Sequence, residues 1–183
     1  MKFSISLEQR NYLHSTSYIS FYNLLNATEL SLVKGSLHKE KGRDVWRSHS
    51  TLKPLIFSKR LVNLVFELTL KKPIRYAFDL YVTEKEDLKE IFGEEPLQNR
   101  MAINPLLGMY LINLQTALGY FILPTATFPY AILEPGPYFL IGYGDKHSQY
   151  LYEIRDPNAH FLKSLGYVFG DRLNDNLHPI LLR

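Results

Sequence analysis

One stretch of this chain, residues 101–133, constrains the fold more than any other. Charged residues make up 21% of the 183 residues, yet no Asp, Glu, Lys, Arg or His occurs between Arg100 and Glu134. Leu, Ile, Met, Tyr and Phe dominate the stretch instead. Because apolar side chains are stable only when they are removed from water, we expect the rest of the chain to pack around this segment.

The pattern of helix-boundary residues in this stretch predicts a buried helix over residues 105–118. Asn104 is a suitable N-cap and Pro105 a suitable first helical residue. Gly119 is typical of the position just after a helix, and Pro124 prevents any continuation. The residues between them are apolar on almost every side of a helical projection, which indicates burial all round.

A membrane-spanning helix is the alternative interpretation of the same stretch. Residues 105–123 approach the roughly 20 residues that a bilayer requires. Asn113, Gln115 and Thr116 lie near the middle, however, and no cluster of Lys or Arg follows to orient a span. The sequence therefore favours a buried helix in a protein that does not contact a membrane.

The composition predicts one globular domain over residues 1–183. The chain is 46% hydrophobic and 14% aromatic, so it can form a substantial core without covalent cross-links. It contains no cysteine, which excludes disulfides and thiolate chemistry and suits a cytoplasmic protein. Its first residues show no apolar segment typical of a secretion signal.

The order of the predicted elements suggests an α+β fold. The first half, residues 1–100, partly matches a ferredoxin-like sheet with an extra strand. Strands are predicted at residues 2–7, 29–33, 61–70 and 75–82, and helices near residues 16–25 and 83–92. Residues 101–183 would then supply the buried helix and a C-terminal hairpin of strands 138–143 and 149–154, which closes the core. A short helix is expected around residues 159–165.

The charges are divided unevenly along the chain. Residues 1–76 contain 13 Lys and Arg against 5 Asp and Glu, a net charge of +8. Residues 77–183 contain 8 against 13, a net charge of −5. Such a chain either binds an acidic partner through its first part or neutralises itself across an internal interface.

A basic arm over residues 36–60 is the main candidate for a binding surface. It lacks apolar periodicity, and Trp46, the only Trp, lies within it. Cations attract phosphates and an indole can stack on a base, so the arm is typical of an RNA-binding or other nucleic-acid-binding surface. The candidate residues at this surface are Lys34, Lys39, Lys41, Arg43, Trp46, Arg47, His49, Lys53, Lys59 and Arg60.

From these features we expect a non-enzymatic subunit of a larger assembly. Its expected partners are the other protein subunits of that assembly and, at the basic arm, a nucleic acid or an acidic protein. We expect it to need no cofactor. The plain alternative is a solvated basic loop that Trp46 anchors to the core.

An enzymatic alternative rests on His14. The run Tyr12-Leu13-His14-Ser15-Thr16, followed by a helix that contains Asn26, is similar to the opening of some ADP-ribosyltransferases, although that family usually has Gly where this chain has Ser15. The resemblance implies a strand-end histidine that hydrogen-bonds the nicotinamide ribose of NAD. It also implies a late acidic residue, for which Glu153 is the candidate.

Other catalytic patterns are missing from the sequence. The His residues do not have the spacing of a metal site, no Gly-rich phosphate-binding loop is present, and no nucleophile-elbow pattern surrounds a Ser. The sequence therefore predicts no metal.

Overall fold

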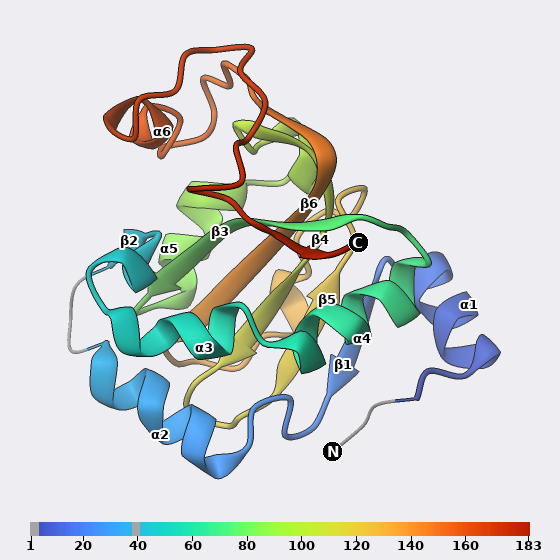
Figure 1. The fold of residues 1–183 in the computed structure, drawn as a ribbon. Helices are drawn as coiled ribbons and strands as arrows, with labels where there is room; N and C mark the ends of the chain where they lie inside the picture. Colours follow the sequence, from blue (N-terminus) through green and yellow to red (C-terminus); the bar gives the residue numbers. More distant parts are fainter. Residues whose placement is uncertain (1–3, 38–40) are drawn as a thin grey trace.

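The computed structural model describes residues 4–37 and 41–183 and shows a curled sheet with helices on both faces (Figure 1). The sheet order is β1-β5-β4-β6-β3-β2, and β7 also pairs with β3. All these pairings are antiparallel in the described part of the chain. The strands are β1 (Tyr18–Phe21), β2 (Gly42–Arg43), β3 (Ile74–Val82), β4 (Ile103–Asn113), β5 (Gly119–Ile122), β6 (Tyr138–Tyr150) and β7 (Ile180–Leu182).

The helices divide between the two faces of the sheet. Figure 1 shows α2, α3 and α4 across one face, and α5 and α6 on the other side. The α-helices are α1 (Leu7–Thr16), α2 (Ala27–Ser36), α3 (Lys53–Ile56), α4 (Lys59–Thr69), α5 (Lys85–Phe92) and α6 (Phe161–Ser164). The 3-10 turns are η1 (Val45–Arg47), η2 (Ser50–Leu52), η3 (Leu97–Asn99) and η4 (Tyr130–Ile132).

Two hydrophobic clusters cover the two faces of the sheet, and β4 contributes to both. Met109 and Leu111 point into the cluster beneath α5, whereas Tyr110 and Ile112 point into the cluster beneath α4. All four side chains are buried. This alternation places β4 at the centre of the molecule, so the uncharged stretch does organise the core.

The predicted buried helix over residues 105–118 is wrong, because this stretch forms β4, a turn and β5. A strand covered on both faces is apolar at nearly every position, as a fully buried helix is, so periodicity cannot separate the two. Gly108 has a φ of 153° and packs against Phe121 so closely that a Cβ would lie 2.4 Å from the ring. Such close packing against a backbone position is typical of a glycine within a strand.

The strand predicted over residues 61–70 is also wrong, because these residues lie in α4. Leu61, Leu64, Val65 and Leu68 are buried at helical spacing and form one apolar stripe against the sheet. The β-branched and aromatic residues of this segment suggested a strand, but tertiary packing overrode that weak propensity.

Residues 4–37 also differ from their predicted elements, and the strand predicted over residues 29–33 lies in α2. Residues 1–3 lie outside the described residues, and Ser6 begins α1 through a capping box with Gln9. The helix expected near residues 16–25 is replaced by β1, and α2 begins at Asn26, whose side chain pairs with Glu29 in a second capping box. Both boxes match a sequence pattern that promotes helix initiation.

Two predictions in the middle of the chain are confirmed, and a later one is not. Residues 75–82 lie in β3, and α5 ends at Gly93 as expected. The hairpin predicted at residues 138–154 is instead one long strand, β6, which runs through the expected turn and pairs with both β4 and β3.

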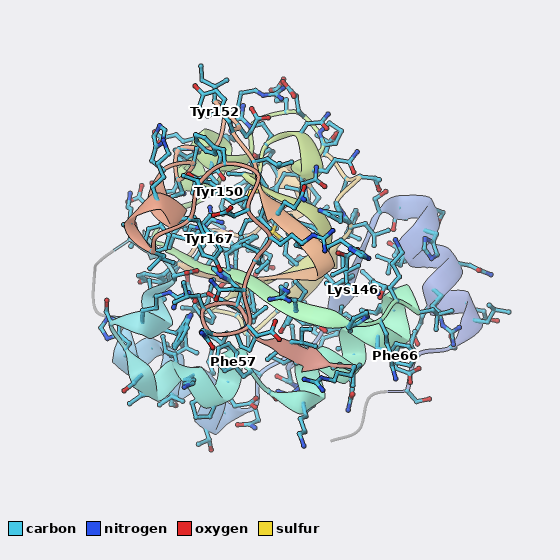
Figure 2. All side chains as sticks on the ribbon, turned by 45° about the horizontal axis from the view of Figure 1, so that its top comes forward. Phe57, Phe66, Lys146, Tyr150, Tyr152 and Tyr167 are labelled. Atoms are coloured by element: carbon cyan, nitrogen blue, oxygen red, sulfur yellow. The ribbon has the colours of Figure 1, made fainter. Side chains whose placement is uncertain are left out.

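The end of β6 carries an aromatic cluster. Figure 2 shows Tyr150 and Tyr152 close together, with Tyr167 on the neighbouring segment. Tyr150 is fully buried, its ring lies 4.6 Å from that of Phe169, and its hydroxyl donates to the carbonyl of Ala159. These contacts fix residues 150–171 against the sheet.

The ferredoxin-like fold class is therefore wrong. The predicted ferredoxin-like sheet needs a strand at residues 61–70, and the predicted buried helix follows residue 100, whereas the structure has a helix and a strand in those places. Within the described residues, no helix is long and apolar enough to cross a membrane. That the chain forms one domain stays a prediction.

Candidate functional site

A cavity of about 330 Å³ lies where α1, the segment after α4, the start of β4 and the end of β5 come together. We call it the His14 cavity. Its volume is at the lower end of the range for small-molecule sites, about 300–1,000 Å³. The polar side chains that line it are His14, Thr69, Lys71, Gln98, Asn104 and Thr125.

Four separate elements bring these polar residues together. His14 lies in the last turn of α1, and Lys71 follows the end of α4, where Leu70 adopts a left-handed conformation with φ 54°. Asn104 lies in β4, and Gln98 lies in η3, whose backbone N–H donates to the carbonyl of Pro124 at 2.9 Å. The cavity is thus assembled by tertiary packing.

The polar groups of the cavity are available to a ligand. The side chains of His14, Lys71, Gln98 and Asn104 make no hydrogen bond or ion pair with any residue in the described ranges. His14, Lys71 and Gln98 are exposed and Asn104 is partly buried, so all four side chains can be reached by a ligand that enters the cavity.

A second polar cluster is buried beneath η1 and contains two carboxyl groups. The hydroxyl of Tyr76 lies 2.7 Å from Oδ1 of Asp44 and 2.8 Å from Oδ1 of Asp79. One phenol proton cannot be donated to both carboxylates, so one carboxyl must itself carry a proton. Burial, followed by the charge of Asp44, raises the pKa of Asp79 to about 8, which identifies Asp79 as the protonated partner.

His178 closes this cluster from the C-terminal segment. Its ring stacks on Tyr76 at 5.8 Å between centroids, and its Nδ1 lies 2.8 Å from the hydroxyl of Tyr167. Burial, followed by the charges of Arg47, Arg43 and Arg75, lowers the pKa of His178 to about 3. The ring is therefore neutral, and the cluster ties η1 and the C-terminal segment to β3.

The structure disperses the residues predicted to bind an acidic partner. Trp46 is half-buried, and its Nε1 donates to the hydroxyl of Tyr76 at 3.0 Å. Lys53 lies 5.7 Å from the Trp46 ring, and His49 is half-buried. Lys34 and Lys59 are exposed, and Lys39 lies outside the described residues.

The other four predicted cations form ion pairs with carboxylates of the same chain. These pairs are Lys41–Asp87, Arg43–Asp156, Arg47–Asp44 and Arg60–Glu29, at 2.5 to 3.3 Å. Two of these pairs, Lys41–Asp87 and Arg43–Asp156, join the positive first part of the chain to the acidic second part. A binding role for the ten predicted residues stays a prediction, but the surface they were expected to form is interrupted.

The structure does not bring the two residues of the transferase alternative to one site. His14 lies in a helix, not at the end of a strand. Glu153 accepts hydrogen bonds from Arg155, whose proximity lowers the pKa of that carboxyl, and it does not line the His14 cavity. The transferase alternative is therefore wrong.

Sequence reasoning missed three residues of the cavity. The sequence predicts a helix cap at Asn104, and Lys71 and Gln98 stand out in no catalytic pattern. The signal that could have found Lys71 is the helical stripe of α4, which would have placed it just after a helix. Within the described ranges, no group of three or more His, Cys, Asp or Glu side chains could hold a metal ion.

Comparisons with solved structures relate the fold to a group of jelly-roll-like proteins. The carbocyclase SnoK from nogalamycin biosynthesis, described as non-heme and alpha-ketoglutarate dependent, is 12% identical over 98% of each chain, with a TM-score of 0.70. The epimerase SnoN, from the same biosynthesis and described in the same way, is 14% identical over 95% of each chain, with a TM-score of 0.66. CT296 from Chlamydia trachomatis is 18% identical over 79% of this chain and 97% of its own, with a TM-score of 0.60.

These similarities define the fold. No family model matches the sequence, and no curated protein matches it either. The similarities nevertheless overturn the predicted function, because this fold is shared with two enzymes. The hypothesis of a non-enzymatic, RNA-binding assembly subunit is wrong.

Proposed function

We propose that the protein is an enzyme that transforms a small molecule bound in the His14 cavity. The observation that carries this proposal is the meeting of His14, Gln98 and Asn104, none of them paired within the described protein, at one cavity of ligand size. The two enzymes with the same fold support it. A concave site with a few convergent polar groups is the usual form of an active site.

The residues of the cavity favour proton transfer next to a carbonyl group. Neutral imidazole of His14 accepts a proton from the carbon beside the carbonyl, and the C–H electron pair forms a C=C bond while the carbonyl π pair moves to oxygen. The side-chain N–H groups of Gln98 and Asn104 donate to that oxygen and stabilise the enolate. The imidazolium then returns the proton to carbon, so the net reaction is an isomerisation or epimerisation that needs no co-reactant.

An iron centre that uses 2-oxoglutarate is the chemistry named for SnoK and SnoN. The described residues of this chain do not fit such a centre. Such a centre needs two His and one carboxylate around the iron, and no set of three His, Asp or Glu side chains converges among the described residues. The sheet face beneath α5 carries Phe78, Met109 and Leu140, none of which is a ligand for iron of this kind. The proposed reaction therefore uses no iron.

Two further parts of the proposal concern the setting of the enzyme. A chain without cysteine suits a cytoplasmic enzyme, and partner subunits stay a prediction of the sequence. Microscopy of a fluorescent fusion and light scattering of the purified protein test these two points.

Deuterium exchange tests the proposed reaction directly. The purified protein is incubated in D₂O with small ketones and small oxo acids, and ¹H NMR follows the loss of protons next to each carbonyl. We expect exchange in at least one compound. His14→Asn should slow it by about 100-fold or more, because general acid–base groups contribute rate factors of that order.

The matched control is His147→Asn, because His147 is an exposed histidine of β6 that does not line the cavity. This variant should exchange at the wild-type rate. Absence of exchange throughout the panel, or equal rates for the wild type and His14→Asn, contradicts the proposal. Succinate release that depends on added Fe²⁺ and 2-oxoglutarate contradicts the iron-free reaction.

A further inference from the structure

The lining of the His14 cavity is mixed in chemistry. Leu106 and Leu107 of β4 and Leu123 after β5 contribute apolar side chains. His14, Lys71, Gln98 and Asn104 are among the polar residues that line the same cavity. A ligand that fills such a cavity has both an apolar body and a polar group, because each kind of lining residue stabilises only the ligand surface that matches it.

The charge of the cavity lining is positive. Lys71 lines the cavity, whereas no Asp or Glu is found among the described lining residues. Some lysines elsewhere are engaged, since Lys41 pairs with Asp87 and Lys85 donates to the carbonyl of Leu133 at 3.1 Å, whereas Lys34 and Lys59 are exposed. The ammonium group of Lys71 makes no such contact with any residue in the described ranges.

We propose that the ligand of the His14 cavity is a small carboxylate with an apolar body, and that Lys71 binds its carboxylate group. This inference rests on the proposed function, because it names the class of substrate for the same cavity. The single lysine matches a monoanion. A phosphate monoester is more highly charged and is typically bound by Arg forks or by several donors of a Gly-rich loop, which the cavity does not offer.

The assignment separates binding from chemistry within the cavity. Lys71 binds the carboxylate, and the leucine side chains of the lining cover the carbon chain. His14, Gln98 and Asn104 contact the reactive carbonyl group. The reaction then occurs on an oxo acid rather than on a neutral ketone. Lys71 is a binding residue in this arrangement, and its loss weakens affinity more than it slows proton transfer in the bound state.

Calorimetric titration of the full chain tests the inference. The probes are hexanoate, uncharged hexanamide, and hexyl phosphate, each at low and high salt. The wild type should bind hexanoate and should not bind hexanamide measurably. Lys71→Gln should weaken hexanoate binding by about 10-fold or more, which corresponds to the loss of one charge-assisted hydrogen bond.

Lys72→Gln is the matched control. Lys72 is the next residue, carries the same charge and lies 4.6 Å from the Phe66 ring, outside the cavity lining. Its variant should bind hexanoate with wild-type affinity. Equal affinity for hexanamide, equal losses in the two lysine variants, or tighter and equally Lys71-dependent binding of hexyl phosphate overturns the carboxylate assignment.

The outcomes distinguish this inference from the proposed function. Lys71-dependent binding of hexanoate without deuterium exchange in any compound removes the enzymatic proposal and leaves the ligand class. Exchange that depends on His14 but occurs in neutral ketones, with no effect of Lys71→Gln, removes the ligand class and leaves the enzyme.

Discussion

Replacement of Asp79 by Asn should remove the loss of stability that the wild-type protein undergoes above pH 6.5. Asp79 is fully buried, and its Oδ2 accepts the backbone N–H of Val45 at 2.9 Å while Oδ1 faces the hydroxyl of Tyr76. Asparagine keeps both contacts, because its oxygen accepts from Val45 and its amide donates to the phenol oxygen. It differs only in that it cannot ionise.

The magnitude follows from two pKa shifts of opposite sign. The pKa of Asp79 rises from 3.8 to about 8 on folding, so its contribution to stability is fully present below pH 3.8 and is lost as the pH rises toward 8. The pKa of His178 falls from 6.5 to about 3, so its contribution is present above pH 6.5 and is lost as the pH falls toward 3. The two slopes oppose each other between pH 3.8 and 6.5.

Above pH 6.5 the Asp79 slope dominates. It is at most about 1.4 kcal/mol per pH unit, falls to half near pH 8 and is partly offset by the last part of the His178 slope, so the wild type should lose about 1 kcal/mol between pH 6.5 and pH 8. Urea denaturation at pH 6.5, 7, 7.5 and 8 measures this loss. The stability of Asp79→Asn should not fall over the range, and the stability of Glu67→Gln, which removes a carboxylate on α4 outside the cluster, should follow the wild type.

Parallel pH profiles for the wild type and Asp79→Asn would refute the reasoning. They would mean that Asp79 is already ionised in the folded protein, and that the Tyr76 hydroxyl is not shared between a neutral and a charged carboxyl group.

Three further predictions concern buried contacts, each measured by urea denaturation at pH 6.5. Arg43→Met should cost about 3–5 kcal/mol, because it leaves Asp156 buried without its cation, and adding Asp156→Asn should recover much of that loss. Gly142→Ala should cost about 1–3 kcal/mol, since the new Cβ would lie 2.2 Å from the Phe78 ring, whereas Gly35→Ala in α2, with open space around it, should add about 0.5–1 kcal/mol of stability. Tyr76→Phe should cost about 1–3 kcal/mol, because Trp46 loses its acceptor, while Tyr81→Phe, whose hydroxyl bonds to no described residue, should cost much less. An equal change in the free energy of unfolding for the two variants of any of these pairs would contradict the contact that the first variant disturbs.

The boundaries of several elements could be predicted from the sequence, because local chemistry determines them. The acidic first turn and Gly93 define α5, and the aromatic and aliphatic residues of the segment 75–82 indicate β3. The uncharged stretch was correctly placed in the core. Its form was not, because β4 is covered on both faces and therefore lacks the alternation by which a half-buried strand is recognised.

The candidate site was less predictable, because the sequence distance between its residues is large. His14 was noticed for a local pattern that proved unrelated to its position, and Lys71, Gln98 and Asn104 meet it only through tertiary packing, in which α1 contacts β1 and α4. The internal ion pairs of the basic arm were not predictable for the same reason. Arg43 pairs with Asp156, which is 113 residues away in the sequence, although Arg47 pairs locally with Asp44.

Histidine side-chain NMR measures most directly whether the His14 cavity is the ligand site. The chain has six histidines, and comparison with His14→Asn assigns the signals of His14. During titration with hexanoate, the account predicts that the ring signals of His14 shift and saturate along the calorimetric binding curve, while those of His147 stay in place. Saturable binding that leaves the His14 signals unmoved would contradict it.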